Sequence, residues 1–444
     1  MEKPAPTSFY KRLTLLALPI IGQDLLNALV QMVDTFMIGS LGETAITAVG
    51  LANQLFFVYI MVVFGLSSGS AILMSQYYGM KDFKSIRKTL GIGVGLSAAV
   101  SFLFAFFALA APELVMSLYS KDPAVVVEGA KYLRIAGFSY LINAFIVPIN
   151  TALKSMNLPK YPMYTTAIAL TVSVSLNFLF IIILGFGVRG AAVSTLTARV
   201  VEICAQLFLI NKAKLPLAGA IKDYFSANRE FVKKYIVLAA PVVASAIAWA
   251  IGTSMYNVAY KHCGTQAQAG VQIAAAIHNI FWVIGMGIGS ASGIILANVL
   301  GAGETEKAIS YSKKIVRVIT PVGLLMGLAL VFVAPLIAGM FNVPNEVKEY
   351  VRLVTYVFAA IYTLKLNNFT TIVGVLRSGG DTLYPAVMEL VIVWLVAVPL
   401  AFLGAYVLKL PIYWVVLMVQ AEDVLKFVTM TPRRLTNRWA KTLV

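Results

Sequence analysis

The sequence has few charged residues and few of the residue types that build disulfide or metal centres. Asp, Glu, Lys and Arg make up 12% of the 444 residues, while 60% of the chain is hydrophobic; about a quarter of the residues in a soluble domain are charged. The two cysteines, Cys204 and Cys263, give no disulfide framework. The two histidines, His262 and His278, have no carboxylate or cysteine at ligand spacing, so no metal site or cofactor is predicted. This composition argues against a soluble globular domain.

Acidic residues are scarcer than basic ones. The chain has 19 Asp and Glu residues against 35 Lys and Arg residues, a net charge of +16. A charge of this size could indicate a nucleic-acid partner, but the basic residues gather in short polar segments between long apolar runs. That distribution is typical of the loops that orient membrane helices. We therefore expect the lipid bilayer, and no nucleic acid, as a partner.

The sequence is instead rich in long, continuous apolar runs. Spans of roughly 20 to 25 residues fit about twelve times into the chain. Because the runs are continuous instead of alternating, they predict helices and not a barrel. The expected fold class is an all-α integral membrane protein with twelve transmembrane helices. The expected spans are roughly 13–38, 46–78, 90–112, 133–155, 162–184, 190–211, 235–260, 267–300, 315–337, 350–376, 384–406 and 411–430.

The stretch 13–79 recurs without a gap 222 residues later, and 222 is half of the chain. We therefore predict a duplicated unit, with an N-lobe at 1–211, a cytoplasmic linker at 212–234 and a C-lobe at 235–444. Six spans per half is an even number, so both halves have the same orientation and form a parallel, pseudo-twofold repeat, as in many secondary transporters. The aligned pairs are Pro19 with Pro241, Gly42 with Gly264, Ala45 with Ala267, Gly65 with Gly287, Ser68 with Ser290, Ser70 with Ser292 and Gly79 with Gly301.

The distribution of Lys and Arg predicts the orientation. With a cytoplasmic N-terminus, 25 of the 35 basic residues fall in cytoplasmic segments and eight in outer ones, while Arg199 and Lys365 lie within spans. Cytoplasmic loops carry the excess of positive charge in membrane proteins. Both termini of this multi-pass cell-membrane protein are therefore expected in the cytoplasm.

The two copies differ at one position that bears on function, where Asp34 falls opposite Tyr256. An acid inside a span costs about 2.5–3.5 kcal/mol on insertion scales, so an unpaired one usually faces a cavity and has a function. Gln23, Asn27, Gln31 and Asp34 follow at spacings of four, four and three, which places them on one helix face. The hypothesis is that Asp34 carries a coupling ion; the alternative is an acid that reaches out to the membrane edge or caps the next turn.

Other polar residues within spans have competing interpretations. Asp24, a quarter turn off the polar face, is a second candidate acid. Arg199 and Glu202 are three residues apart and are predicted to neutralise each other. A lone ammonium near mid-membrane is costly, so Lys365 is predicted to form a structural ion pair in preference to a substrate contact. Its candidate partners are Glu389, Glu422 and Asp423.

The fourth span carries three polar side chains. Tyr140, Asn143 and Asn150 could line a substrate cavity together with Gln31, or they could form hydrogen bonds between helices. Glycines also recur at four-residue spacing, as at Gly65 and Gly69. In lipid this spacing lets helix backbones approach closely, so we predict a packing role for these glycines.

Four groups of residues resemble the signatures of one transporter family. They are Val33–Gly42 followed by Ala48-Val49-Gly50; Leu176-Asn177 with Leu184–Gly187 and Gly190–Ala192; Gly374–Thr382; and Trp394 with Pro399. These stretches look like the first helix, the fifth-to-sixth helix junction, the tenth-helix ending and the eleventh helix of multidrug and toxic compound extrusion (MATE) transporters. The resemblance covers nearly the whole chain at the expected spacing.

The resemblance implies a twelve-helix, two-lobed antiporter that exports amphipathic, often cationic, organic compounds in exchange for protons or sodium ions. Asp34 and Asn177 match the first-helix acid and fifth-helix asparagine that bind the coupling ion in family members; Thr195 matches a sixth-helix threonine, and Asn27 is assigned to the same site. Some members carry a second acid where this chain has Ile181. Fewer acidic ligands favour protons over sodium, which needs several oxygens at once.

Another branch of the family couples through acids on the seventh and tenth helices, but here the seventh-helix position is Trp249. The resemblance therefore gives no support for coupling through the C-lobe.

Three rival functions share some of these features. A lipid-linked saccharide flippase of the same superfamily would usually line its cavity with several cations, and cations within these spans are few. A major facilitator would carry a glycine-and-acid motif after its second helix, but in Gly79-Met80-Lys81-Asp82 the spacing is one residue short and the second glycine is missing. A membrane-embedded enzyme needs a metal cluster or a nucleophile–base pair. We expect a monomeric transporter of organic cations or drugs, and not an enzyme.

Overall fold

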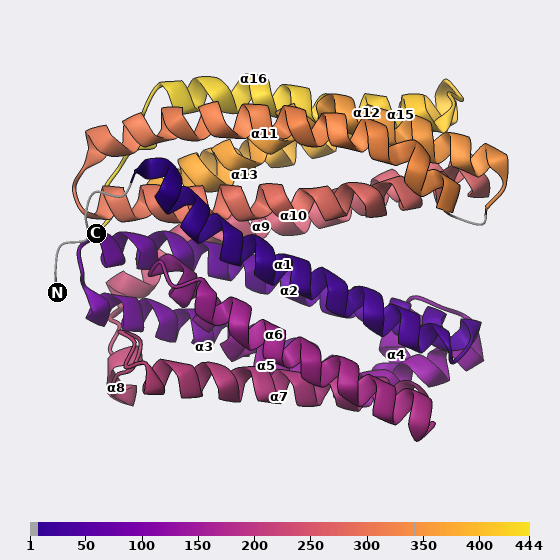
Figure 1. Ribbon diagram of the computed structural model, residues 1–444, viewed down its shortest axis with the longest axis horizontal. Coiled ribbons are helices and arrows are strands. Elements are labelled where there is room, and N and C mark those ends of the chain that lie inside the picture. Colours follow the sequence, from indigo (N-terminus) through magenta and orange to yellow (C-terminus); the bar gives the residue numbers. More distant parts are fainter. Residues whose placement is uncertain (1–7, 341–342) are drawn as a thin grey trace. The chain divides into compact units, whose positions relative to one another are not determined.

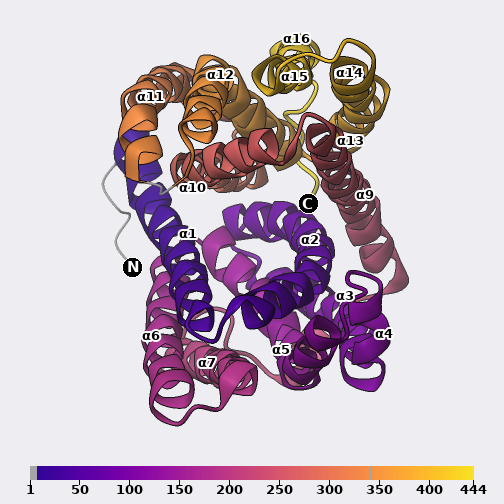
Figure 2. The same ribbon diagram turned by 90° about the vertical axis from the view of Figure 1, so that its right-hand side faces the viewer.

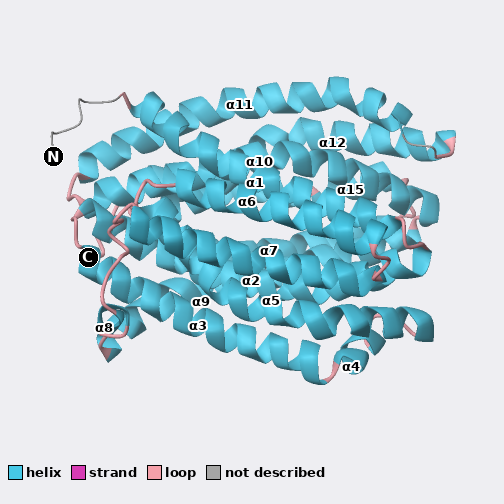
Figure 3. Ribbon diagram, turned by 60° about the horizontal axis from the view of Figure 1, so that its bottom comes forward, coloured by secondary structure: helices cyan, strands magenta, loops and turns pink. Residues whose placement is uncertain are grey.

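A computed structural model of the chain describes residues 8–340 and 343–444. The secondary structure of these residues is helical throughout, with no strand (Figure 3). Ten segments are long and apolar enough to cross a membrane. They are Phe9–Gly39 (α1), Glu43–Gly79 (α2), Phe83–Ala110 (α3), Pro123–Ser155 (α5), Lys160–Ile183 (α6 with η1), Gly187–Lys212 (α7), Arg229–His262 (α9), Thr265–Gly301 (α10), Thr305–Leu336 (within α11, Thr305–Met340) and Leu383–Val407 (α13 to η5).

Two further helical segments carry more charge and fall outside this set. One is α12 (Asn345–Phe369) with its π-helical continuation η2 (Thr370–Leu376); the other is α15 (Ile412–Val419) followed by α16 (Ala421–Leu435). Short helices α4 (Pro112–Ser117) and α8 (Ile221–Tyr224) lie in connections. The prediction of an all-α protein with many apolar helices is thus confirmed for the described residues.

Equivalent glycines start the second helix of each copy. Gly42 has a φ of 100° and Gly264 a φ of 109°, a conformation that glycine adopts without the penalty of a side chain. Each glycine directly precedes a helix of 37 residues, α2 or α10. The two helices begin and end at positions that the sequence alignment pairs.

The chain forms two compact units (Figure 1). The N-unit is Gly22–Val243, and the C-unit comprises the described residues up to Ile21 together with Ala244–Val444. The boundaries therefore fall inside α1 and α9, two residues after Pro19 and Pro241. The polar segment 212–234 lies wholly within the N-unit.

In the N-unit, α5 packs against α2, α3 and α7, and α6 packs against α7 (Figure 2). The first half of α9 belongs to this unit and lies on α2, where a β-carbon on Gly69 would be 2.7 Å from the Cα atom of Ala239. Gly65 faces α9 in the same way, so the predicted packing role of these two glycines is observed. The polar segment folds onto α3, where Arg87 donates to the carbonyl oxygen of Pro216 at 2.9 Å and forms an ion pair with Asp223 at 3.3 Å.

In the C-unit, α12 packs against α10, α11 and α16, and η2 packs against α10. The first half of α1 contributes Phe9, Leu13 and Ile20 to a buried cluster with Ile295 and Leu300 of α10. Burying this apolar face fixes the start of α1 within the C-unit.

Candidate functional site

The N-unit encloses a cavity of about 560 Å³ between its helices. The eight residues predicted to bind a coupling ion or a substrate all line it: Asn27, Gln31, Asp34, Tyr140, Asn143, Asn150, Asn177 and Thr195. They come from α1, α5, α6 and α7, which are far apart in the sequence. Asp24, the second candidate acid, is not among the residues that line this cavity.

Asp34 and Asn177 meet in this cavity. The Asn177 side-chain nitrogen Nδ2 donates to Asp34 Oδ1 at 2.5 Å. Asn177 is 1% exposed, and its Oδ1 has no hydrogen-bond partner in the part of the chain that the structure describes. It is the last residue of α6 before the π-helical turns Phe178–Ile183. Such local unwinding is frequent at functional sites because it turns side chains and backbone groups away from the regular ladder.

The polar face of α1 points into the cavity as its spacing predicted. Gln23, Asn27, Gln31 and Asp34 all line the cavity. Gln23 lies at the buried end of this face and donates to the Thr166 hydroxyl of α6 at 3.1 Å. The stripe is therefore anchored to a neighbouring helix at one end and meets Asn177 at the other.

Arg199 and Glu202 form the predicted ion pair, with Arg199 Nη1 and Glu202 Oε2 2.6 Å apart. Both residues also line the cavity, a position that our sequence analysis did not predict. Glu202 is 1% exposed and accepts a second bond from Thr166 at 3.1 Å. The signal was available in the sequence, because Thr195, Arg199 and Glu202 follow at helical spacing on one face of α7.

The polar residues of α5 combine lining and bonding roles. Asn150 accepts a hydrogen bond from Gln206 of α7 at 2.9 Å, and Asn143 donates to the carbonyl oxygen of Ser139 one turn earlier at 2.9 Å. Tyr140 stacks on Tyr59 of α2 with ring centroids 5.1 Å apart. The two interpretations left open from the sequence, cavity lining and hydrogen bonding, therefore hold together for Asn150.

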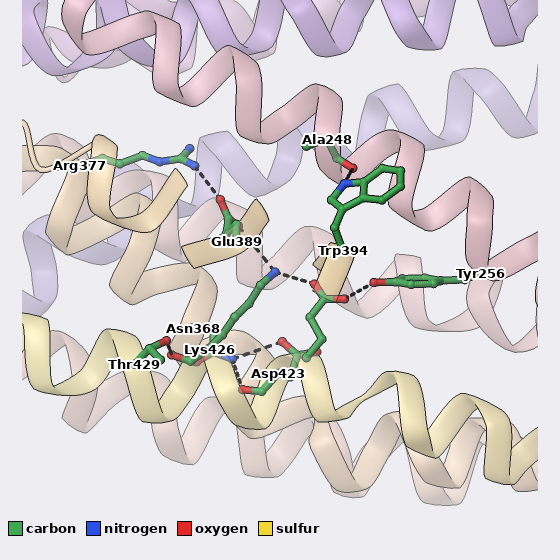
Figure 4. Close-up of polar contacts among 10 residues, drawn as sticks. Ala248, Tyr256, Asn368, Arg377, Glu389, Trp394, Asp423, Lys426 and Thr429 are labelled. Carbon is green, nitrogen blue, oxygen red and sulfur yellow. Dashed lines mark hydrogen bonds and ion pairs between the residues drawn. The ribbon is translucent and has the colours of Figure 1, made fainter. Parts of the chain in front are cut away.

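The C-unit holds a second polar region, an ion network buried around α16 (Figure 4). Lys426 Nζ lies 2.6 Å from Glu422 Oε1 and 3.7 Å from Glu389 Oε1. Arg377 reaches the other oxygen of Glu389 at 3.5 Å, and the Tyr256 hydroxyl donates to Glu422 Oε2 at 2.7 Å. Tyr256, which stands where the N-unit has Asp34, thus supports an acid from another helix.

Lys365 is not in an ion pair with any residue that the structure describes, contrary to our expectation. Its ammonium group lies over the ring of Trp282, 5.6 Å from the centroid. The acids Glu389 and Glu422 are paired with Lys426 and Arg377 instead. Lys426 takes that place because it lies one helical turn after Glu422 on the same face of α16.

Comparisons with known proteins agree with these features. The sequence model of the MatE family matches residues 19–179 and 241–403, and the two matches begin 222 residues apart. An uncharacterized transporter of Bacillus subtilis, YisQ, is 21% identical over 91% of this chain and 89% of its own. The probable multidrug resistance protein NorM of Thermotoga maritima is 23% identical over 88% of this chain and 85% of its own.

Solved structures show the same fold. A MATE protein crystallised in complex with MaL6 superposes with a TM-score of 0.88 at 19% identity, covering 96% of both chains. The outward-facing structure of a multidrug resistance MATE family transporter gives a TM-score of 0.88 at 19% identity, covering 98% of this chain and 100% of that one. Since both halves of the sequence match its model, this chain belongs to the MatE family of multidrug efflux transporters, and it is a multi-pass membrane transporter and not an enzyme.

Proposed function

We propose that the protein is a secondary antiporter that exports amphipathic organic cations in exchange for protons, with Asp34 as the coupling carboxylate. The observation that carries the proposal is the contact of Asp34 with Asn177 inside a polar cavity. An ionised Asp34 attracts a cation, and a protonated Asp34 no longer does. Export follows if the cavity opens alternately to the two sides of the membrane while this charge changes, as in other repeat-built transporters.

The groups around Asp34 favour a proton over a sodium ion. Sodium is held by several oxygen ligands at once, but the other acid of the cavity, Glu202, is occupied by Arg199 and Thr166. The positive charge of Arg199 also acts on Asp34, so a metal cation would bind against a fixed like charge. A proton needs only one carboxylate oxygen. The remaining site residues, Asn27 and Thr195, supply polar contacts and no further acid.

The proposed architecture is twelve transmembrane helices in two six-helix lobes, 1–211 and 235–444, with the linker 212–234 and both termini in the cytoplasm. We count α12 with η2 and α15 with α16 as spans, because the charges Glu422, Asp423 and Lys426 are buried in the C-unit and do not face lipid. The equal bounds of α2 and α10 support a parallel repeat. We propose that the protein acts as a monomer in the lipid bilayer.

A lipid-linked saccharide flippase is the alternative from the same superfamily. Such a protein would use several cations to hold the phosphate groups of its substrate. Arg199 is the single basic residue among those lining the N-unit cavity, and it is paired with Glu202. Export of organic cations therefore has the better support, with Gln31, Tyr140, Asn143 and Asn150 as the substrate-facing residues.

The test is dye transport in proteoliposomes, driven separately by a pH step and by a sodium step. The Asp34→Asn variant keeps the shape of the side chain but cannot titrate, so we expect it to fold and to lose pH-driven transport. Glu43→Gln makes the same chemical change at an exposed acid of α2 and should transport normally. Transport by Asp34→Asn at the unmodified rate would refute the proposal, and transport driven by sodium alone would replace the proton with sodium.

A further inference from the structure

The C-unit network contains three acids and two bases in direct contact with one another or with buried amides. Glu389, Glu422 and Asp423 are the acids, and Arg377 and Lys426 are the bases. Glu422, Asp423, Lys426 and Arg377 are each at most 8% exposed. Buried acids and bases are stable only when their charges are compensated, so the extra acid needs an explanation.

Two of the three acids are fully used. Glu422 binds Lys426 through one carboxylate oxygen and the Tyr256 hydroxyl through the other, at 2.6 and 2.7 Å. Glu389 has Arg377 at one oxygen and Lys426 at the other, at 3.5 and 3.7 Å. Both carboxylates therefore have a positive partner.

Asp423 is the acid without a basic partner within ion-pair distance among the described residues. Its Oδ1 accepts a hydrogen bond from Asn368 Nδ2 at 3.2 Å, and the same nitrogen donates to the backbone oxygen of Asp423 at 2.7 Å (Figure 4). Asn368 comes from α12, two residues before the π-helical segment η2. Asp423 thus depends on an amide for its one side-chain contact.

The amide of Asn368 is itself incompletely bonded. Asn368 is 3% exposed, and its Oδ1 has no hydrogen-bond partner within residues 8–340 and 343–444. A buried polar atom without a partner costs about 1–3 kcal/mol. The pair of Asp423 and Asn368 therefore has an acceptor in excess and lacks one hydrogen.

We propose that Asp423 and Asn368 form a second proton-binding site, located in the C-unit and separate from Asp34. A hydronium ion transfers one proton to the Asp423 carboxylate, which leaves a neutral carboxylic acid and a water molecule. The new O–H group is the donor that the Asn368 oxygen lacks, and a rotation of the side chains brings the two together. The Asp34 and Asn177 pair has the same chemistry, since Asn177 Oδ1 is also without a partner.

The charges that face Asp423 decide which cation it takes. Glu422 and Lys426 lie on its own helix, Lys365 on α12 acts on it from its place over Trp282, and Asn368 is its hydrogen-bond partner. Tyr256 of α9 and Glu389 of α13 touch the network at Glu422 and Lys426. Lysines on two helices oppose a metal ion at this place, whereas a proton neutralises the extra acid without adding a hydrated charge.

The role of this site in transport rests on the proposed proton coupling and predicts two protons exchanged per substrate instead of one. The binding of the proton does not depend on transport and can be measured directly. We therefore choose infrared difference spectra of the purified full chain between acidic and neutral pH, in which each protonated carboxyl gives a carbonyl-stretch band. The variants are Asp423→Asn and Asp34→Asn, with Glu43→Gln as the matched exposed control.

We expect Asp423→Asn to remove one carboxyl band and Asp34→Asn to remove another, so that each variant takes up one proton fewer than the parent. An unchanged spectrum in Asp423→Asn overturns the second site and leaves Asp34 unaffected; loss of the Asp423 band with no Asp34 band overturns the proposed function and leaves the second site in place. Should Asp423→Asn fail to fold, Asn368→Ala replaces it. Removing the amide must then shift the carboxyl band and its midpoint pH, and an unmoved band contradicts the site.

Discussion

Val243 of α9 packs directly on Gly65 of α2. A β-carbon at Gly65 would lie 2.8 Å from the Cα atom of Val243, closer than van der Waals contact allows. The C-unit has the equivalent contact, in which a β-carbon at Gly287 of α10 would lie 3.1 Å from the backbone nitrogen of Ile21. Each unit is thus completed by the first half of a helix that continues into the other unit.

A second pair of contacts follows the same register. The Tyr59 hydroxyl of α2 donates to the carbonyl oxygen of Tyr140 at 3.0 Å, and the Tyr362 hydroxyl donates to the carbonyl oxygen of Phe281 at 2.9 Å. Phe281 and Tyr362 are the repeat partners of Tyr59 and Tyr140. The direction of the hydrogen bond is reversed, but the same two positions are joined in both units.

The glycine contacts predict an effect on stability. We expect Gly65→Ala and Gly287→Ala to lower the unfolding temperature in detergent, because an added methyl group in a filled contact costs about 1–3 kcal/mol. Gly95→Ala is the control, since Gly95 is also helical and has nothing within 4 Å of its β-position. Equal unfolding temperatures for all three variants would show that the contacts are looser than described.

The hydrogen bond to Asp34 predicts an effect on transport. Asn177→Ala removes the donor to Asp34, and a hydrogen bond to a charged group is worth about 1.5–3 kcal/mol. We expect pH-driven dye efflux to fall at least about tenfold, since about 1.4 kcal/mol corresponds to a factor of ten. Asn257→Ala, at an exposed asparagine of α9, should leave efflux unchanged. Normal efflux by Asn177→Ala would exclude this contact from the coupling step.

The ion pair of Glu422 and Lys426 predicts a coupled effect on stability. Removing one partner of a buried pair leaves an uncompensated charge, so Glu422→Gln and Lys426→Met should each destabilise the protein by about 3–5 kcal/mol. The double variant should be destabilised by clearly less than the sum of the two single effects. Thermal unfolding of the four proteins measures this difference. Additive effects would mean that the two side chains do not act as a pair.

The distribution of basic residues predicts the orientation in the membrane. Cysteines introduced at Ser226 and Thr436, both exposed, should resist an impermeant thiol reagent in whole cells and react after the cells are opened. The background carries Cys204→Ser and Cys263→Ser. Lys121→Cys, in the connection between α4 and α5, should react from outside and serves as the positive control. Reaction of Ser226→Cys in intact cells would reverse the orientation.

The native thiol at the turn between α9 and α10 predicts a dependence on pH. Burial raises the pKa of Cys263 above its ordinary value. The thiolate is the reactive form, and a raised pKa keeps the thiol protonated to a higher pH. Its alkylation in the folded protein should therefore be slower at neutral pH than in the unfolded chain, and the rate should keep rising at pH values where the unfolded chain has reached its plateau. Coincident pH profiles would contradict the burial of this thiol.

Much of the helical layout and part of the site could be read from the sequence because they depend on local spacing. Continuous apolar runs predict helices, since the backbone must satisfy its own hydrogen bonds in lipid. The polar face of α1 follows from spacings of four, four and three, and Gly42 and Gly264 mark turns because their positive φ angles favour glycine. The pair of Arg199 and Glu202 follows from the same helical geometry.

Contacts between helices were decided only by the tertiary structure. Asn177 is 143 residues from Asp34, and their meeting was expected only from the resemblance to a family. Lys426 and not Lys365 neutralises Glu422, because side-chain reach from packed helices decides the partner and the type of charge does not. Helix spacing tells which face of a helix is polar, but the identity of the facing helix depends on packing along the whole interface, and no short stretch of sequence contains that information.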